Sequence, residues 1–216
     1  MKIIKDIRLY RSNKENIEGN SLPSGFRNKK LQITVQRIVM KLREKKFSFG
    51  EFDHLYLNFT PLLKAGKILP AKRDIDRYHS WYRYYDVGVT QNVFDSLENE
   101  EVVEEVIALV KQALISYFLE NENNEEKVSD SISEAIEKGE KMLIFFKEKK
   151  TSKSKAIIYL RYLDEEQYKP LLCVYDIEGN EILREDLPTT LDFSFIGNIL
   201  LNSKRVVYHI LYCCSF

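Results

Sequence analysis

The sequence predicts an α+β protein with mostly antiparallel sheets, about three helices and a C-terminal β meander. Two observations predict this fold class. Short runs in which apolar and polar residues alternate, as in half-buried strands, occur near both ends of the chain. Apolar stripes with the spacing of amphipathic helices lie between these runs. Because helices and strands are partly segregated along the chain, we expect antiparallel pairing to dominate.

The length and composition favour one domain. The chain has 216 residues, of which 44% are hydrophobic, so it can bury a sizeable core. It contains no internal repeat and no linker suited to separating two domains. We therefore expect a single domain over residues 1–216, with an N-terminal α/β part at about 1–140 and the β meander at about 141–216.

Alternating apolar residues, a proline and a basic helix end locate the N-terminal elements. Leu55, Leu57 and Phe59 alternate with the residues between them and precede Pro61, which indicates a strand that ends there. Residues 31–46 begin with the alternation of a strand, but their length and their basic last turn favour a helix. The expected order is a strand at 2–10, a loop at 11–30, the helix at 31–46, strands at 52–60 and 78–87, and helices from about residue 91.

The later elements follow from caps, stripes and a turn. Asn99 is a suitable N-cap for an apolar helix face that extends to Phe118, and Gly139 is placed to end a second helix. Gly179 and Asn180 indicate a hairpin turn. The second helix has Val128, Ile132 and Ile136 on one face. The meander strands are expected at 142–147, 156–163, 171–176, 181–186 and 204–214.

The formal net charge of zero hides a segregation of charge along the chain. Residues 1–86 carry 19 basic and 9 acidic residues, a net charge of +10, whereas residues 87–140 carry 3 and 14, a net charge of −11. Residues 141–216 are nearly balanced at +1. Two compatible explanations stay open. The acidic helices pack beside the basic segment and neutralise it, or an acidic face steers a basic partner.

No residue pattern indicates catalysis, a metal site or a cofactor. The chain contains no Cys-x-x-Cys, no glycine-rich phosphate loop and no Gly-x-Ser-x-Gly. His54, His79 and His209 are far apart in sequence. Asp53 should face away from His54, because neighbours on a strand alternate. We therefore predict a protein that is not an enzyme and uses no metal or cofactor.

The ends and the cysteines favour the cytoplasm. The chain begins with charged residues instead of an apolar signal segment, and its most apolar stretch, residues 102–119, is too polar to span a bilayer. The three cysteines, Cys173, Cys213 and Cys214, have no framework spacing, which is typical of a reducing compartment. We expect a cytoplasmic protein without membrane contact.

Five large aromatic rings lie within residues 78–85. On a strand, Trp81, Arg83 and Tyr85 would share one face, and Tyr82 and Tyr84 would share the other with Tyr78. Tyr, Trp and Arg dominate the binding energy of many protein interfaces. Two alternatives stay open: both faces belong to the core, or one of them is a docking surface.

The segments 52–61 and 82–88, in a motif-free α+β build rich in Tyr, Phe, Lys and Glu, resemble the bacterial immunity proteins that neutralise polymorphic or contact-dependent toxins. The resemblance implies a protein that binds its cognate toxin and catalyses nothing.

We accordingly expect a cytoplasmic, non-enzymatic immunity protein that binds and blocks a bacterial toxin. Exposed carboxylates could fill the basic cleft of a toxin nuclease, and Glu101, Glu104 and Glu105 are the candidate steering charges. Trp81 and Tyr85 are the candidate anchors. One alternative is an enzyme or enzyme subunit whose site assembles only in the fold. Another is an RNA or single-stranded DNA binder that uses the basic N-terminal third, which the acidic segment disfavours.

Overall fold

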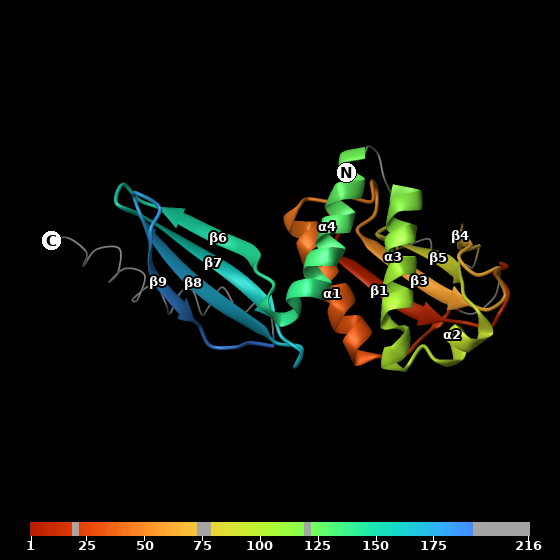
Figure 1. Ribbon diagram of the computed structural model, residues 1–216. Helices are drawn as coiled ribbons and strands as arrows, with labels where there is room; N and C mark the ends of the chain where they lie inside the picture. Colours follow the sequence, from red (N-terminus) through yellow and green to blue (C-terminus); the bar gives the residue numbers. More distant parts are fainter. Residues whose placement is uncertain (19–21, 73–78, 119–121, 192–216) are drawn as a thin grey trace. The chain divides into compact units, whose positions relative to one another are not determined.

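The computed structural model of this chain describes residues 1–18, 22–72, 79–118 and 122–191 (Figure 1). The chain divides into two compact units, residues 1–137 and a second unit that begins at Lys138. The boundary lies close to the division at about residue 140 that the sequence indicates. That both parts form a single domain stays a prediction.

The first unit contains a five-stranded sheet in the order β2-β1-β3-β5-β4. The central strands β1, β3 and β5 run parallel, and the short edge strands β2 and β4 are antiparallel to their neighbours. Asp6 pairs with His54, which pairs with Tyr82, so the three central strands begin in register. The strands are β1 (Asp6–Arg11), β2 (Ser24–Gly25), β3 (His54–Thr60), β4 (Ile68–Pro70) and β5 (Tyr82–Gly88).

Four α-helices belong to the described part of the first unit. The Asn28 side chain accepts a hydrogen bond from the backbone N–H of Leu31 and so caps the first helix, and its Nδ2 donates to the carbonyls of Leu97 and Asn99. One buried asparagine therefore ties the helix start to a distant loop. The helices are α1 (Lys29–Glu44), α2 (Gln91–Asp95), α3 (Val103–Phe118) and α4 (Glu122–Lys138), with a 3-10 turn η1 (Glu100–Val102) before α3.

The two faces of this sheet are built from different residues. One face is apolar, and the Tyr85 ring on this face packs against Tyr117 and Phe118 of α3, so α3 covers it. Helix α1 contacts both β1 and α3 (Figure 1). The buried apolar residues of this face are Ile7, Leu55, Leu57, Phe59 and Val87. The opposite face, which we call the tyrosine face, carries Tyr10, Tyr56, Asn58, Tyr82, Tyr84 and Asp86.

The second unit is an antiparallel sheet in the order β6-β7-β8-β9. Gly179 has a φ of +90°, a conformation that glycine adopts without strain, in the turn that joins β8 to β9. The elements are η2 (Gly139–Lys141), β6 (Ile144–Lys150), β7 (Ser154–Tyr162), β8 (Tyr168–Asp176) and β9 (Glu181–Asp186). One face of the sheet buries Ala156, Ile158, Leu172, Val174 and Leu187.

The predicted fold class is confirmed, including the predominance of antiparallel pairing and the meander from β6 to β9. The hairpin turn at Gly179 and the positive φ of Gly139 are confirmed as well. The strand expected at 204–214 lies outside the described residues. Asn99 occupies the N-cap position, but its side chain makes no capping hydrogen bond. Of the three residues on the predicted face of α4, Val128 and Ile132 are buried and Ile136 is 56% exposed. The parallel arrangement of β1, β3 and β5 was not predicted.

Candidate functional site

The acidic surface consists of Glu101 in the 3-10 turn η1 and of Glu104 and Glu105 in the first turn of α3. All three are exposed. Residues three and four positions apart lie on the same side of a helix, so the carboxylates point in a common direction. Their negative charge also suits the positive end of the helix dipole. Within the described ranges, none of the three forms an ion pair with a basic side chain.

Other acidic residues of the same segment pair with the basic N-terminal segment. Both α1 and the strand β1 contribute cations to these pairs, and the acidic partners come from α4 and from the region before α3. The expected self-neutralisation is therefore present, and it leaves the acidic surface outside. The pairs are Arg11–Glu98 (2.9 Å), Lys30–Glu100 (3.3 Å), Lys41–Glu134 (3.2 Å) and Lys45–Asp130 (3.3 Å).

The candidate anchors Trp81 and Tyr85 lie in different surroundings. The ring centroid of Tyr85 is 5.0 Å from that of Tyr117 under α3. The ring centroid of Trp81 is 4.6 Å from that of His54 and 4.8 Å from that of Tyr82. The expectation that Trp81 and Tyr85 share a face is wrong, because Trp81 precedes β5 and its side chain does not follow the alternation of that strand.

Asp53 and His54 contact each other, which corrects the expectation that they face opposite ways. The distance between Asp53 Oδ1 and His54 Nδ1 is 2.6 Å. The backbone N–H groups of both residues donate to the carbonyl oxygen of Trp81, at 3.0 and 3.1 Å. Asp53 lies just before β3, where this shared acceptor interrupts the regular pleat. Strand alternation therefore does not apply to this pair.

Both residues line an open hollow of about 1110 Å³, which we call the cationic hollow. It is formed by the N-terminal segment, the end of α1 and the residues before β3 and β5, and Trp81 lies in its wall. The charged side chains that line it are Lys2, Lys5, Arg43, Lys46, Glu44 and Asp53. Four basic residues thus converge from two segments of the chain on a site with two acidic ones.

Both carboxylates of the cationic hollow have partners within the protein. Asp53 Oδ2 lies 2.8 Å from the Lys5 ammonium, and Glu44 Oε2 lies 2.7 Å from the Lys41 ammonium. Burial acts to raise the pKa of Asp53, but the hydrogen bonds from Lys5 and His54 outweigh burial and hold this pKa below its usual range. Asp53 is therefore ionised, and its carboxylate accepts a hydrogen bond from the Nδ1–H of His54.

The cationic hollow can bind and orient a ligand, but its lining supplies no hydroxyl or thiol nucleophile. None of the residues that line it is Ser, Thr or Cys. Among the described residues, no group of His, Cys, Asp and Glu side chains is arranged to hold a metal ion. The only sequence signal for this site is the excess of basic residues before residue 87, because its walls come together only in the fold.

The tyrosine face is largely internal. Tyr56, Tyr82 and Tyr84 are buried, and the rings of Tyr56 and Tyr82 stack with their centroids 5.0 Å apart. Burial raises the pKa of Tyr56 to about 12. Asn58 Nδ2 donates to Asp86 Oδ1 at 2.7 Å, and both side chains are enclosed. These tyrosines therefore contribute to the core and do not form an open docking surface.

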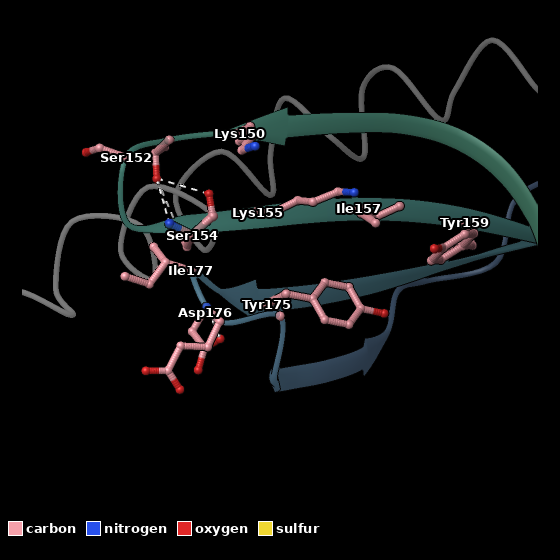
Figure 2. A pocket seen from close by; sticks show the side chains of 12 residues that line it. Lys150, Ser152, Ser154, Lys155, Ile157, Tyr159, Tyr175, Asp176 and Ile177 are labelled. Atoms are coloured by element: carbon pink, nitrogen blue, oxygen red, sulfur yellow. Dashed lines mark hydrogen bonds between the residues drawn. The ribbon is translucent and has the colours of Figure 1, made fainter.

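A second cavity of about 620 Å³ lies on the sheet of the second unit. Figure 2 shows Lys155, Ile157 and Tyr159 along β7 and Tyr175 on the neighbouring β8. The Asp176 carboxylate at its edge accepts hydrogen bonds from Asn180 and from a backbone N–H of the turn. The Asp176 carboxylate at this end of the cavity thus stabilises the turn between β8 and β9.

The fold and these surfaces define an α+β protein with an exposed acidic surface and a basic, ring-lined hollow in its first unit. A comparison of the chain with family models, curated proteins and solved structures finds no match. Among the described residues, no helix has the length and hydrophobicity that crossing a membrane requires.

Proposed function

We propose that this protein is a cytoplasmic, non-enzymatic binding protein, an immunity protein that binds a cognate toxin and blocks it. In this proposal the acidic surface of Glu101, Glu104 and Glu105 contacts a basic surface of the toxin, such as the cleft of a nuclease. Trp81 and Tyr85 stay candidate anchors, although they cannot act together on one face.

One observation carries the proposal. The acidic segment uses Glu98, Glu100, Asp130 and Glu134 to neutralise basic side chains of this chain, whereas the acidic surface makes no ion pair with any described residue. Like charges held close together on a helix repel each other and weaken the fold slightly. Such an arrangement is useful where the charges meet a basic partner, because complementary charge accelerates association.

The test compares two triple variants of equal net charge. The first carries Glu101→Lys, Glu104→Lys and Glu105→Lys, and the control carries the same change at three exposed residues of the second unit, Glu165, Glu166 and Glu185. The candidate toxin is the protein encoded beside this chain's gene. Association with it is measured at low and at moderate salt, together with the protection of cells that express the toxin.

We expect the first variant to associate about 10–100 times more slowly at low salt, with a weaker salt dependence than the unmodified protein. The control variant should associate at nearly the normal rate. Equal association rates for both variants would refute the role of the acidic surface. The absence of both a complex and protection would refute the immunity function itself.

A further inference from the structure

We propose that the cationic hollow binds a small phosphate-bearing ligand with a flat ring, of the chemical class of nucleoside monophosphates. This inference does not rest on the immunity function, because none of the three glutamates of the acidic surface lines the hollow, although Trp81 is named in both proposals. It rests on the cationic side chains, on a fixed imidazole and on the position of Trp81 in the wall.

The lining of the cationic hollow carries an excess of positive charge. Lys2 and Lys46 line the hollow and form no ion pair with any residue that the structure describes. The two carboxylates of the lining are already engaged, Asp53 by Lys5 and Glu44 by Lys41. The hollow therefore presents net positive charge toward solvent, and a phosphate group is a strong partner for converging ammonium groups.

The imidazole of His54 is held in place by Asp53. Its Nδ1 is bound to Asp53, whose carboxylate belongs to a side chain only 7% exposed, so this nitrogen carries the proton. With Nδ1 engaged, Nε2 is the ring nitrogen left for a ligand, and it makes no hydrogen bond with the described residues. A buried carboxylate that orients an imidazole is a typical way to fix the tautomer of a functional histidine. A ligand hydroxyl can form a hydrogen bond with Nε2, because a hydroxyl both donates and accepts.

Trp81 supplies an aromatic ring in the wall of the hollow. Its carbonyl oxygen accepts two backbone hydrogen bonds, and its indole packs edge to face against His54 with an interplanar angle of 72°. The indole is only partly buried and lies in the wall of the hollow. Stacking on an aromatic ring is the sequence-tolerant way in which proteins bind a nucleobase. Phosphate, hydroxyl and flat ring together describe a nucleotide.

The hollow has room for a small ligand. Pockets for drug-sized ligands measure about 300–1,000 Å³, and the hollow, at about 1110 Å³, is somewhat larger and open to solvent. Its lining comes from the N-terminal segment, the end of α1, the Asp53–His54 pair and Trp81. The cations and the single, partly exposed indole ring lie within this one hollow, which suits one phosphate and one base better than a long nucleic acid strand.

Trp81 is the only tryptophan of the chain, so its fluorescence reports binding directly. The full chain is titrated with AMP and UMP, with adenosine as the ring without phosphate, with inorganic phosphate and with a short single-stranded RNA. We expect saturable quenching by a mononucleotide, and about tenfold weaker binding of adenosine or phosphate alone.

The variant Lys2→Ala with Lys46→Ala should weaken mononucleotide binding by about tenfold, because it removes two charged donors. The matched control carries Lys147→Ala and Lys153→Ala, two exposed lysines of the second unit, and should bind normally. Calorimetry with Trp81→Leu should show loss of the ring contribution, so that the variant binds AMP no better than phosphate. Circular dichroism confirms that each variant is folded.

Three results would overturn the proposal. The first is no saturable fluorescence change with either mononucleotide at millimolar concentration. The second is equal binding by the two double variants. The third is tighter binding of the short RNA than of AMP, which would indicate a nucleic-acid surface in place of a mononucleotide site.

Discussion

The buried carboxylate of Asp53 contacts Lys5 and His54, and these two contacts predict how much stability the variant Asp53→Asn should lose. The carboxylate accepts from His54 at 2.6 Å and lies 2.8 Å from the Lys5 ammonium, while the Asp53 side chain is only 7% exposed. The amide of the asparagine keeps the shape of the side chain and one acceptor oxygen. It lacks the negative charge, and its N–H groups are donors next to Lys5 and His54, which are donors too. The backbone hydrogen bonds of residue 53 are unaffected.

The magnitude follows from these two contacts. A hydrogen bond to a charged group contributes about 1.5–3 kcal/mol to stability. The Lys5 side chain is 57% exposed, so this ion pair adds only about 0–1 kcal/mol. Because the amide retains part of the hydrogen bonding, we expect Asp53→Asn to lower the free energy of unfolding at neutral pH by about 2 kcal/mol.

The effect should depend on pH with a defined sign. The pKa of Asp53 is lower in the folded protein than in the unfolded chain. Its contribution is therefore fully present above the unfolded-state value of about 4 and is lost as the pH falls through the folded-state value. The difference between the unmodified protein and Asp53→Asn should shrink below about pH 4 and then disappear.

Urea unfolding followed by Trp81 fluorescence measures this difference in the first unit. The control is Glu185→Gln, which removes an equal charge from an exposed position and should change stability by less than about 0.5 kcal/mol. A difference between Asp53→Asn and the unmodified protein that stays constant from neutral to strongly acidic pH would refute the reasoning. So would an unchanged stability at neutral pH.

Two further predictions concern packing in the first unit. Gly88→Ala should destabilise the protein by about 2–4 kcal/mol, because its Cβ would overlap the Lys64 carbonyl and lie 2.9 Å from the Leu63 Cβ. Gly25→Ala, with nothing within 4 Å, is the control, and equal melting temperatures would contradict this. Burial raises the pKa of Tyr56 to about 12, so stability should fall between about pH 10 and 12. Tyr56→Phe should lose less stability there, and identical alkaline denaturation curves would disprove the assignment.

Local patterns were sufficient to place most helices and strands. The last turn of α1 and the alternation of Leu55, Leu57 and Phe59 are short-range features that the printed sequence contains. The parallel pairing of β1, β3 and β5 could not be predicted in this way, since alternation indicates a strand without indicating its neighbour. Tyr56 and Asn58 lie on the other face of β3 and are buried as well, so this strand has no solvated face.

The two candidate sites also differ in whether the sequence could reveal them. The acidic surface could be found because Glu101, Glu104 and Glu105 lie within five residues of one continuous helical segment, η1 and the start of α3, where sequence spacing largely determines direction. The cationic hollow could not, because it joins the N-terminus, the end of α1 and the residues before two strands. The Asp53–His54 contact was missed because a rule for regular strands was applied to a residue just outside one.

The order of strands in the first unit also has a consequence for how the chain folds. Asp6 pairs with His54, so the β1–β3 ladder joins residues roughly fifty positions apart, whereas each ladder from β6 to β9 joins strands that are consecutive in sequence. Distant pairings require the loss of loop-closure entropy before any contact energy is gained, which slows folding. On a ribosome, β1 leaves the exit tunnel long before β3 does. Apart from its short pairing with β2, β1 therefore waits longest for its partner, whereas each strand of the meander follows directly on its neighbour in the chain.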